Sequence, residues 1–326
     1  MKPFRLLLAA AALALAGCTQ HAQDSAPGTL VLRVGHFPNI THVQALVANA
    51  LSRQGKGWFE QRLGPGVTIQ WYSYNAGPSA TEGLMDGTVD LTYVGPSPAI
   101  NAYCRSSGQD IRIISGAVDG GSALVVQPDE NLKTAADFRG KKIATPQLGN
   151  TQDVTCRAWL AAGGLSITQN GGDAQVLPTE NPDQLALFKR KQIDAAWTVE
   201  PWVSRLEMEA GGVPLVQDKE TTITVLASSA KFLAEHRDIA TKFVAANHEL
   251  TVWIEQHPDE AQKLVLFELT AETRGKISPA LVAHAWNSIV LTDDFTQATV
   301  DQFVAKAKAA GFLKQTPDFS QFIVHL

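Results

Sequence analysis

The stretch "VGHFPNITHVQAL", Val34 to Leu46, reads as the end of a strand, a turn and the start of a helix. After the turn, apolar residues recur at helical spacing. The turn itself carries a Pro followed by Asn, Ile, Thr and His. In α/β proteins, ligands bind where strands end and the following helices begin. We therefore predict that this turn contributes to a ligand-binding site.

The succession of strand, turn and helix continues from Leu30 to about Thr224, which predicts an α/β fold with parallel sheets. After about Ser228, long amphipathic segments predict a helical C-terminal region. The expected strands are Leu30–Gly35, Val67–Tyr72, Asp90–Val94, Ile111–Ala117, Ala123–Gln127, Lys142–Thr145, Ala174–Leu177, Asp194–Thr198 and Val213–Val216.

The chain has 326 residues, of which 45% are hydrophobic and 18% are charged, and this length suits about two globular domains. Its formal charge of −5 and its lack of a Lys/Arg cluster argue against a nucleic-acid partner. His36 and His42 lie six residues apart, whereas metal-binding pairs on a helix lie four apart. We expect no metal site and no cofactor, with His42 exposed in the first helical turn.

The first residues have the pattern of an export signal. Lys2 and Arg5 precede an apolar run, Leu6 to Ala16, that is too short to span a bilayer. The run closes with "LAGC", which resembles a bacterial lipobox and ends at Cys18. We predict a signal peptide over 1–17, lipidation of Cys18, and a flexible tether over 18–29. An ordinary soluble signal peptide is the alternative.

Two further cysteines, Cys104 and Cys156, remain after the lipidated one. In an oxidising compartment they form either a disulfide or two separate buried thiols, because the sequence does not give their proximity.

Polar residues that begin helices follow several of the expected strands. Thr41 to Gln44 and Ser79 to Glu82 have the capping-box pattern, and Asn150 and Asn181 mark two further helix starts. The adjoining loops "NAGPS", "VGPSP" and "TPQLGN" are rich in Gly and Pro, which suits close approach of a ligand to the backbone. Free N–H groups at helix starts bind anions, so the sequence predicts a polar or anionic ligand.

One motif suggests an enzyme, because "GPSPA", Gly95 to Ala99, matches the nucleophile elbow of serine hydrolases. Here Ser97 precedes Pro98, which favours an extended backbone at the serine. We therefore interpret Ser97 as a helix cap and predict that the protein is not an enzyme.

Four stretches in register resemble solute-binding proteins of ABC importers, of the nitrate/taurine/alkanesulfonate/bicarbonate type. They are "LRVGHFPNITHVQALVA", "YNAGPSATEGLMDGTVDLTYVGPSPAINAY", "GKKIATPQLGNTQDVTCRAWL" and "IDAAWTVEPWVSRLEMEAGG". The resemblance implies a two-lobed periplasmic-binding-protein fold, type II-like, with a mostly parallel sheet in each lobe and the ligand cleft between them. Lobe one would comprise 30–118 plus 224–326, and lobe two 119–223.

The resemblance also implies that the ligand contacts residues at the strand-to-helix turns. They are His36, Phe37, Asn39, Thr41, Gly77, Ser79, Gly95, Ser97, Pro98, Gln147, Asn150, Thr151, Gln152, Glu200 and Trp202. Amide and hydroxyl groups would hold an oxyanion, Phe37 and Trp202 would cover an apolar tail, and His36 and Glu200 would discriminate by charge. The nearest cation, Arg157, lies about two turns into its helix. This favours a monoanion, a zwitterion or a neutral heterocycle.

The implied function is delivery of a small solute to an ABC permease in the inner membrane. We expect a monomer in the periplasm or at the cell surface, anchored to a membrane by its lipid. An alkanesulfonate- or taurine-like ligand is the first choice, with nitrate or bicarbonate next. A binder of a pyrimidine thiamine precursor, or a ligand-sensing partner of a membrane receptor, is the alternative.

Overall fold

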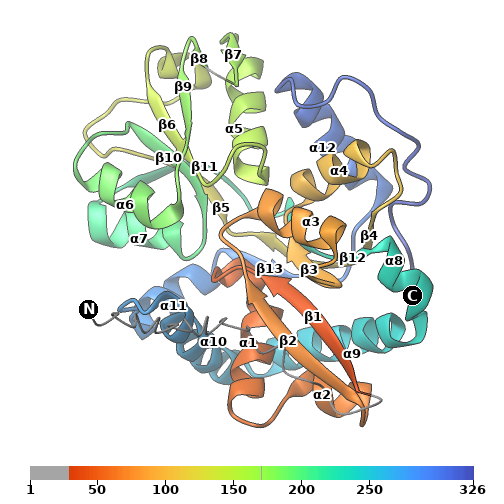
Figure 1. Ribbon diagram of the computed structural model, residues 1–326. Helices are drawn as coiled ribbons and strands as arrows, with labels where there is room; N and C mark the ends of the chain where they lie inside the picture. The colour runs from red at the N-terminus through yellow and green to blue at the C-terminus, as the bar shows by residue number, and fades with distance from the viewer. Residues whose placement is uncertain (1–28, 170) are drawn as a thin grey trace, which may run out of the picture.

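The computed structural model describes residues 29–169 and 171–326 as a two-lobed α/β fold with one large sheet in each lobe (Figure 1). The first sheet has the strand order β13–β4–β12–β3–β1–β2, and the second has the order β11–β5–β10–β6–β9. The strands are β1 Leu30–His36, β2 Val67–Ser73, β3 Leu91–Val94, β4 Ile111–Gly120, β5 Ser122–Val126, β6 Lys142–Thr145, β7 Ile167–Thr168, β8 Gly171–Gly172, β9 Gln175–Pro178, β10 Ala195–Val199, β11 Val213–Asp218, β12 Thr222–Ser229 and β13 Ile289–Leu291.

Helices cover both sheets, and the C-terminal third is largely helical (Figure 1). The α-helices are α1 Val43–Arg53, α2 Trp58–Leu63, α3 Gly77–Asp86, α4 Pro96–Arg105, α5 Thr151–Ala162, α6 Asn181–Lys189, α7 Trp202–Ala210, α8 Ala230–Glu235, α9 Arg237–Gln256, α10 Pro258–Thr273, α11 Pro279–Trp286 and α12 Gln297–Ala309. Two short 3-10 helices are η1 Ile40–His42 and η2 Ala135–Phe138.

Both sheets are mixed, whereas mostly parallel sheets were expected. Strand β1 pairs in parallel with β2 and β3, but β12 pairs antiparallel with β3 and β4. In the second sheet, β6 pairs in parallel with β9 and β10, but β5 pairs antiparallel with β10 and β11. Strands β4, β5, β11 and β12 carry the chain between the sheets without a strand–helix–strand crossover, so parallel pairing is not imposed on them.

The first crossing between the sheets is a sharp turn at Gly120 and Gly121. Both residues have positive φ, 73° and 70°, a conformation that a side chain would strain. The chain returns through β12, whose residues are all buried. This strand was not predicted, and it lies at the centre of the first sheet.

Apolar residues pack on each sheet separately, with one exception. Between α1, α2, α9 and α10 and the first sheet, Phe59 stacks on Phe243 with ring centroids 4.0 Å apart. On the other side, α12 packs against both α4 and α5. There, Val154 and Ala158 of α5 join an apolar cluster that otherwise belongs to the first sheet and its helices. This cluster therefore connects the two halves.

The two cysteines are free thiols, so the disulfide that was one of two alternatives is not present. Cys104 packs against the cluster around α4, whereas Cys156 is buried in the core of the second sheet. Burial raises the pKa of both thiols, to about 11 for Cys104.

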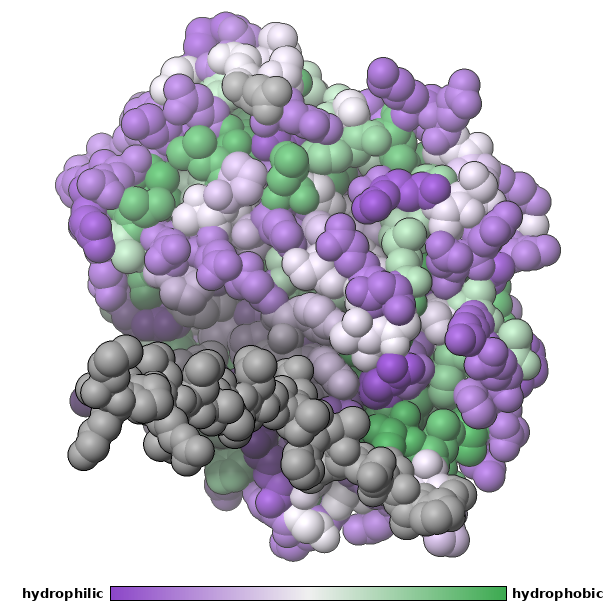
Figure 2. Space-filling view, viewed as in Figure 1, coloured by the Kyte–Doolittle hydropathy of each residue, from purple (hydrophilic) through white to green (hydrophobic). Residues whose placement is uncertain are grey.

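The predicted signal peptide, Cys18 and the tether up to residue 28 lie outside the described residues. Within 29–169 and 171–326, no helix is both long enough and apolar enough to cross a bilayer. Hydrophilic side chains cover most of the face in Figure 2, and the apolar ones are gathered in separate patches.

Candidate functional site

A small cavity lies between the two sheets, at the ends of β1, β3, β6 and β10. Its volume of about 20 Å³ is enough for roughly one water molecule. A larger ligand therefore needs the two halves to separate. The lining residues are Phe37, Asn39, Thr41, His42, Asn75, Ala76, Gly77, Gly95, Pro98, Pro146, Asn150, Thr151, Gln152, Asn181, Val199, Ile223 and Thr224.

Four helices begin at this cavity. Gly77 is the first residue of α3, Gly95 is the cap of α4, Asn150 is the cap of α5 and Asn181 begins α6. Helix starts carry free N–H groups and a partial positive charge. The four helix dipoles therefore favour an anion in the cavity, although the lining contains no Arg or Lys.

Nine of the fifteen predicted site residues line this cavity, namely Phe37, Asn39, Thr41, Gly77, Gly95, Pro98, Asn150, Thr151 and Gln152. The other six, His36, Ser79, Ser97, Gln147, Glu200 and Trp202, lie outside its lining. Three of these six connect the halves around the cavity. Trp202 Nε1 donates to Asn39 Oδ1 at 3.1 Å, and Gln147 Nε2 donates to Ser79 Oγ at 3.3 Å.

His36 and Glu200 do not face the cavity, so neither is placed to discriminate ligands by charge. His36 Nε2 lies 2.6 Å from Glu272 Oε1 of α10, and its ring packs edge-on against Trp71. Glu200 lines a separate small hollow, where its Oε2 accepts from Ser204 N at 3.0 Å. Burial raises the pKa of the Glu200 carboxyl.

The predicted helix caps are partly wrong. Asn150 caps α5 as expected, because its Oδ1 accepts from Asp153 N at 2.8 Å. Thr41 lies within η1, Ser79 lies inside α3, and Ser97 lies inside α4, whose first residues are Pro96 and Ser97. Pro is tolerated in the first helical turn, so Pro98 does not prevent Ser97 from being helical.

His42 is a lining residue that the sequence analysis missed. Its exposed fraction is 2%, whereas an exposed side chain was expected. Phe37 N donates to His42 Nδ1 at 3.3 Å, and the two rings lie 4.2 Å apart. Burial, with a smaller contribution from His36, holds the pKa of His42 well below its usual value. The imidazole is therefore neutral at pH 7.

Two threonine hydroxyls at the cavity are free to bind a ligand. Thr151 Oγ1 and Thr224 Oγ1 are buried, and neither has a hydrogen-bond partner among the described residues. Buried hydroxyls are seldom left unpaired in folded proteins. Thr224 belongs to the unpredicted strand β12, which explains why sequence reasoning missed it.

The loop before α5 is held by a buried ion pair. Arg157 Nε lies 3.1 Å from both carboxylate oxygens of Asp153, and both residues are almost fully buried. Asp153 also accepts from Thr145 Oγ1 and from Gly149 N, each at 2.9 Å. Arg157 thus positions the end of β6 and the start of α5, and its charge does not reach the cavity lining.

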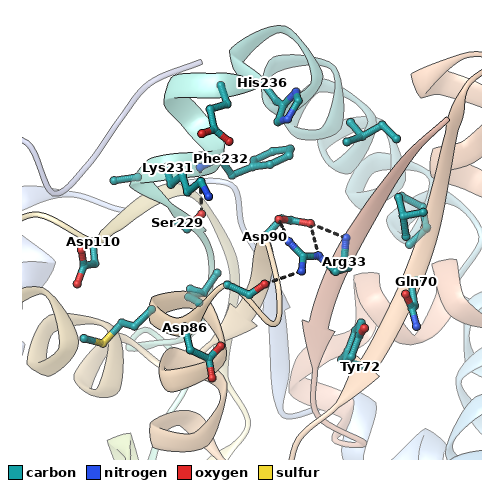
Figure 3. A pocket seen from close by; sticks show the side chains of 18 of the residues that line it. Arg33, Gln70, Tyr72, Asp86, Asp90, Asp110, Ser229, Lys231, Phe232 and His236 are labelled. Carbon is teal, nitrogen blue, oxygen red and sulfur yellow. Dashed lines mark hydrogen bonds and ion pairs between the residues drawn. The ribbon is translucent and has the colours of Figure 1, made fainter. Parts of the chain in front are cut away.

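A much larger depression, about 1710 Å³, lies at the opposite ends of β1 and β2 (Figure 3). Arg33 spans it, but its guanidinium is engaged by Asp90 at 2.7 and 3.0 Å and by the carbonyl of Gly87. Asp86 and Asp110 also border it. Its lining contains four carboxylates, of Asp86, Asp90, Asp110 and Glu235, which disfavour an anion, and Arg33 is already paired. We therefore place the candidate site in the smaller cavity between the sheets.

Comparisons with known proteins agree with this fold. A provisionally named aliphatic sulfonates-binding protein of Bacillus subtilis (strain 168) is 27% identical over 81% of this chain and 77% of its own. The taurine-binding periplasmic protein of Escherichia coli (strain K12) is 24% identical, over 79% and 83%. The alkanesulfonate-binding protein SsuA from Xanthomonas axonopodis pv. citri, bound to MOPS, has a TM-score of 0.75 at 21% identity, covering 92% and 100%. The profile of the NMT1-like family matches residues 25–267, and the chain belongs to this family.

Proposed function

We propose that the protein is an exported solute-binding protein that captures a small oxyanion between its lobes and delivers it to an ABC importer. The observation that carries this proposal is the convergence of four helix starts on a cavity whose lining has no acidic residue, Lys or Arg. Helix N-termini and neutral hydroxyl or amide donors suit a monoanion. Relatives named as binding proteins support a role in binding and not in catalysis.

An alkanesulfonate- or taurine-like solute is the first choice of ligand, with nitrate or bicarbonate next. Relatives named for aliphatic sulfonates and taurine support this order. The aromatic pair Phe37–His42 at the cavity would equally stack on a flat heterocycle, which keeps a pyrimidine as the second candidate.

We propose lobe boundaries at 30–118 plus 224–326 and at 119–223. In support, every strand of the second sheet lies between Ser122 and Asp218. The two crossings near Gly120 and Thr222 would then act as hinges, and the lobes would close on the ligand. We also propose that Cys18 carries a lipid, so that the mature protein is tethered at a membrane and acts as a monomer.

Thermal unfolding and calorimetric titration of the mature protein test the proposal. Ligands raise the melting temperature of a folded protein that binds them. We expect ethanesulfonate to raise it, and nitrate or bicarbonate to do so more weakly. A response to a hydroxymethylpyrimidine alone would favour the heterocycle, and no response to any anion would contradict an oxyanion site.

The variant Thr151→Val removes one free hydroxyl from the cavity with little change in shape. Loss of a hydrogen bond to a charged ligand should weaken binding by about 1.5–3 kcal/mol, or roughly 10- to 100-fold. The matched control is Thr241→Val, on the exposed side of α9, which should bind as the wild type does. Equal affinities of the two variants would count against this cavity.

A further inference from the structure

We propose that the cavity selects oxyanions that carry no ammonium group, because its lining holds no carboxylate, and that His42 binds the oxyanion as an uncharged N–H donor. This inference rests on the proposed oxyanion-binding function. The relatives are named for aliphatic sulfonates and for taurine, so their names do not decide between the two ligands. This inference does decide, because it favours plain alkanesulfonates over amino-sulfonates such as taurine.

The hydrogen bonding of His42 fixes which ring nitrogen carries the proton. Its Nδ1 accepts from Phe37 N, so in the neutral ring the proton lies on Nε2. Within the described part of the chain, no side chain or carbonyl is hydrogen-bonded to that Nε2. Contact with the Phe37 ring at 4.2 Å holds the imidazole in place. His42 thus offers the cavity one N–H donor.

Burial keeps His42 neutral, since desolvation lowers its pKa and nearby His36 lowers it further. The titratable residues that face it are few: the lining of the cavity contains no other His and no Asp, Glu, Lys or Arg. A neutral ring donates to an oxyanion without requiring a second charge. It repels no cation, but it supplies no negative charge to hold one.

No lining residue offers an ammonium group a carboxylate, so only neutral acceptors remain. Four amide oxygens of lining residues each accept a hydrogen bond within the protein. The donors are Trp202 Nε1 to Asn39, Asp153 N to Asn150, Asn150 Nδ2 to Gln152, and Thr198 Oγ1 to Asn181. Glu200, a carboxylate that was expected to discriminate ligands by charge, opens onto a different hollow. An ammonium group enclosed here would be a buried, unpaired charge, which is costly.

Ethanesulfonate and taurine make a matched pair of probes, because they differ only by the ammonium group. We expect calorimetric titration of the mature protein at pH 7.5 to show ethanesulfonate binding at least ten-fold more tightly. Taurine binding as tightly as ethanesulfonate, or more tightly, would overturn this inference and leave the oxyanion site intact. Binding of neither ligand, nor of nitrate, would overturn both.

Two variants test the donor itself. His42→Phe keeps an aromatic ring against Phe37 but removes the N–H, together with the Nδ1 that accepts from Phe37 N, and should weaken ethanesulfonate binding about ten-fold or more. His42→Gln restores an N–H donor and should recover part of the loss. Wild-type affinity in a folded His42→Phe protein would overturn the assignment.

The variant Asn39→Asp tests the missing negative charge. Asp keeps an oxygen for the bond from Trp202 Nε1 and adds a carboxylate to the lining. We expect the ratio of taurine to ethanesulfonate affinity to rise at least five-fold. An unchanged ratio would contradict the claim that the absence of a carboxylate sets the preference.

Discussion

Trp202 Nε1 donates a hydrogen bond to Asn39 Oδ1 at 3.1 Å, and this bond joins the start of α7, which follows β10 of the second sheet, to the turn after β1 of the first. Beside it, Ile40 N donates to the carbonyl of Glu200 at 3.0 Å. The turn after β1 is therefore hydrogen-bonded to the segment that follows β10. These contacts can persist only while the two halves are close together, so they stabilise the closed arrangement around the cavity.

Replacing Trp202 by Phe removes the side-chain bond between the halves and keeps an aromatic ring. A neutral hydrogen bond contributes about 0.5–1.5 kcal/mol, so ligand affinity should fall roughly two- to ten-fold. Trp159→Phe, a partly buried residue that packs against the core of the second sheet, is the matched control. Calorimetry gives the affinities, and small-angle scattering without ligand should show a larger radius of gyration for Trp202→Phe alone. If both variants bound the ligand with equal affinity, the bond between Trp202 and Asn39 would not contribute to closure of the two halves.

Gly95 faces Thr151 of the other half across the cavity. A Cβ at this position would overlap Thr151 Oγ1 at the start of α5. Gly95 has a φ of −70°, so Ala would not strain its own backbone. The overlap would instead make closure of the two halves less favourable. We expect Gly95→Ala to fold normally but to bind ligand at least ten-fold more weakly.

The overlap between residue 95 and Thr151 can be tested by shortening the Thr151 side chain. If Gly95→Ala acts by contact with Thr151, adding Thr151→Ala should cost less in the Gly95→Ala background than in the wild type. Purely additive losses in the double-mutant cycle would show that Gly95 acts in another way.

The backbone of the fold could be predicted because its signals are local. All nine expected strands coincide with observed ones to within three residues at each end, and β6, Lys142–Thr145, coincides fully. These strands are short apolar runs bounded by turn residues. The strand β12, "TITVLASS", was missed although its first half, Thr222 to Val225, is β-branched, and only its Ala and Ser residues have weak strand propensity. Its burial comes from neighbours on both sides, which no local pattern reveals.

Site residues could be predicted from the sequence where the position of the backbone alone brings them to the cavity. They were predicted less well where the direction of the side chain determines whether a residue lines the cavity. Gly77, Gly95 and Asn150 line the cavity because helices begin there. His36 and Phe37 are neighbours at a strand end, so their side chains point to opposite sides, and the sequence does not tell which side holds the ligand. The short helix η1 turns His42 inward, where an ordinary first turn would have exposed it.

Glu268 gives the fold a pH dependence of known sign. Its carboxylate is fully buried in α10, 2.7 Å from Asn49 Nδ2 and 2.8 Å from Arg53 Nε. Burial is the main cause that raises its pKa to about 7, and nearby Glu272 raises it further. Between pH 4.5 and about 7 the folded state binds the extra proton, so the free energy of unfolding falls as pH rises, by up to about 1.4 kcal/mol per unit.

Glu268→Gln should remove this dependence, because Gln stays neutral while still accepting hydrogen bonds. Urea unfolding at pH 5, 6, 7 and 8 should show the variant gaining stability relative to the wild type as pH rises. Glu260→Gln, exposed on α10, is the control and should show no such trend. A stability difference that is constant across these pH values would contradict the assignment to Glu268.

Arg157 should prove essential to the site although it does not touch the cavity. Arg157→Met leaves the Asp153 carboxylate buried without its cation, which should cost about 3–5 kcal/mol in the free energy of unfolding. Adding Asp153→Asn removes the stranded charge and should recover part of that loss. Because Asp153 holds Thr145 and Gly149, both proteins should also bind ligand more weakly. If Arg157→Met were as stable as the wild type in urea, the loop before α5 would have to be held by other contacts.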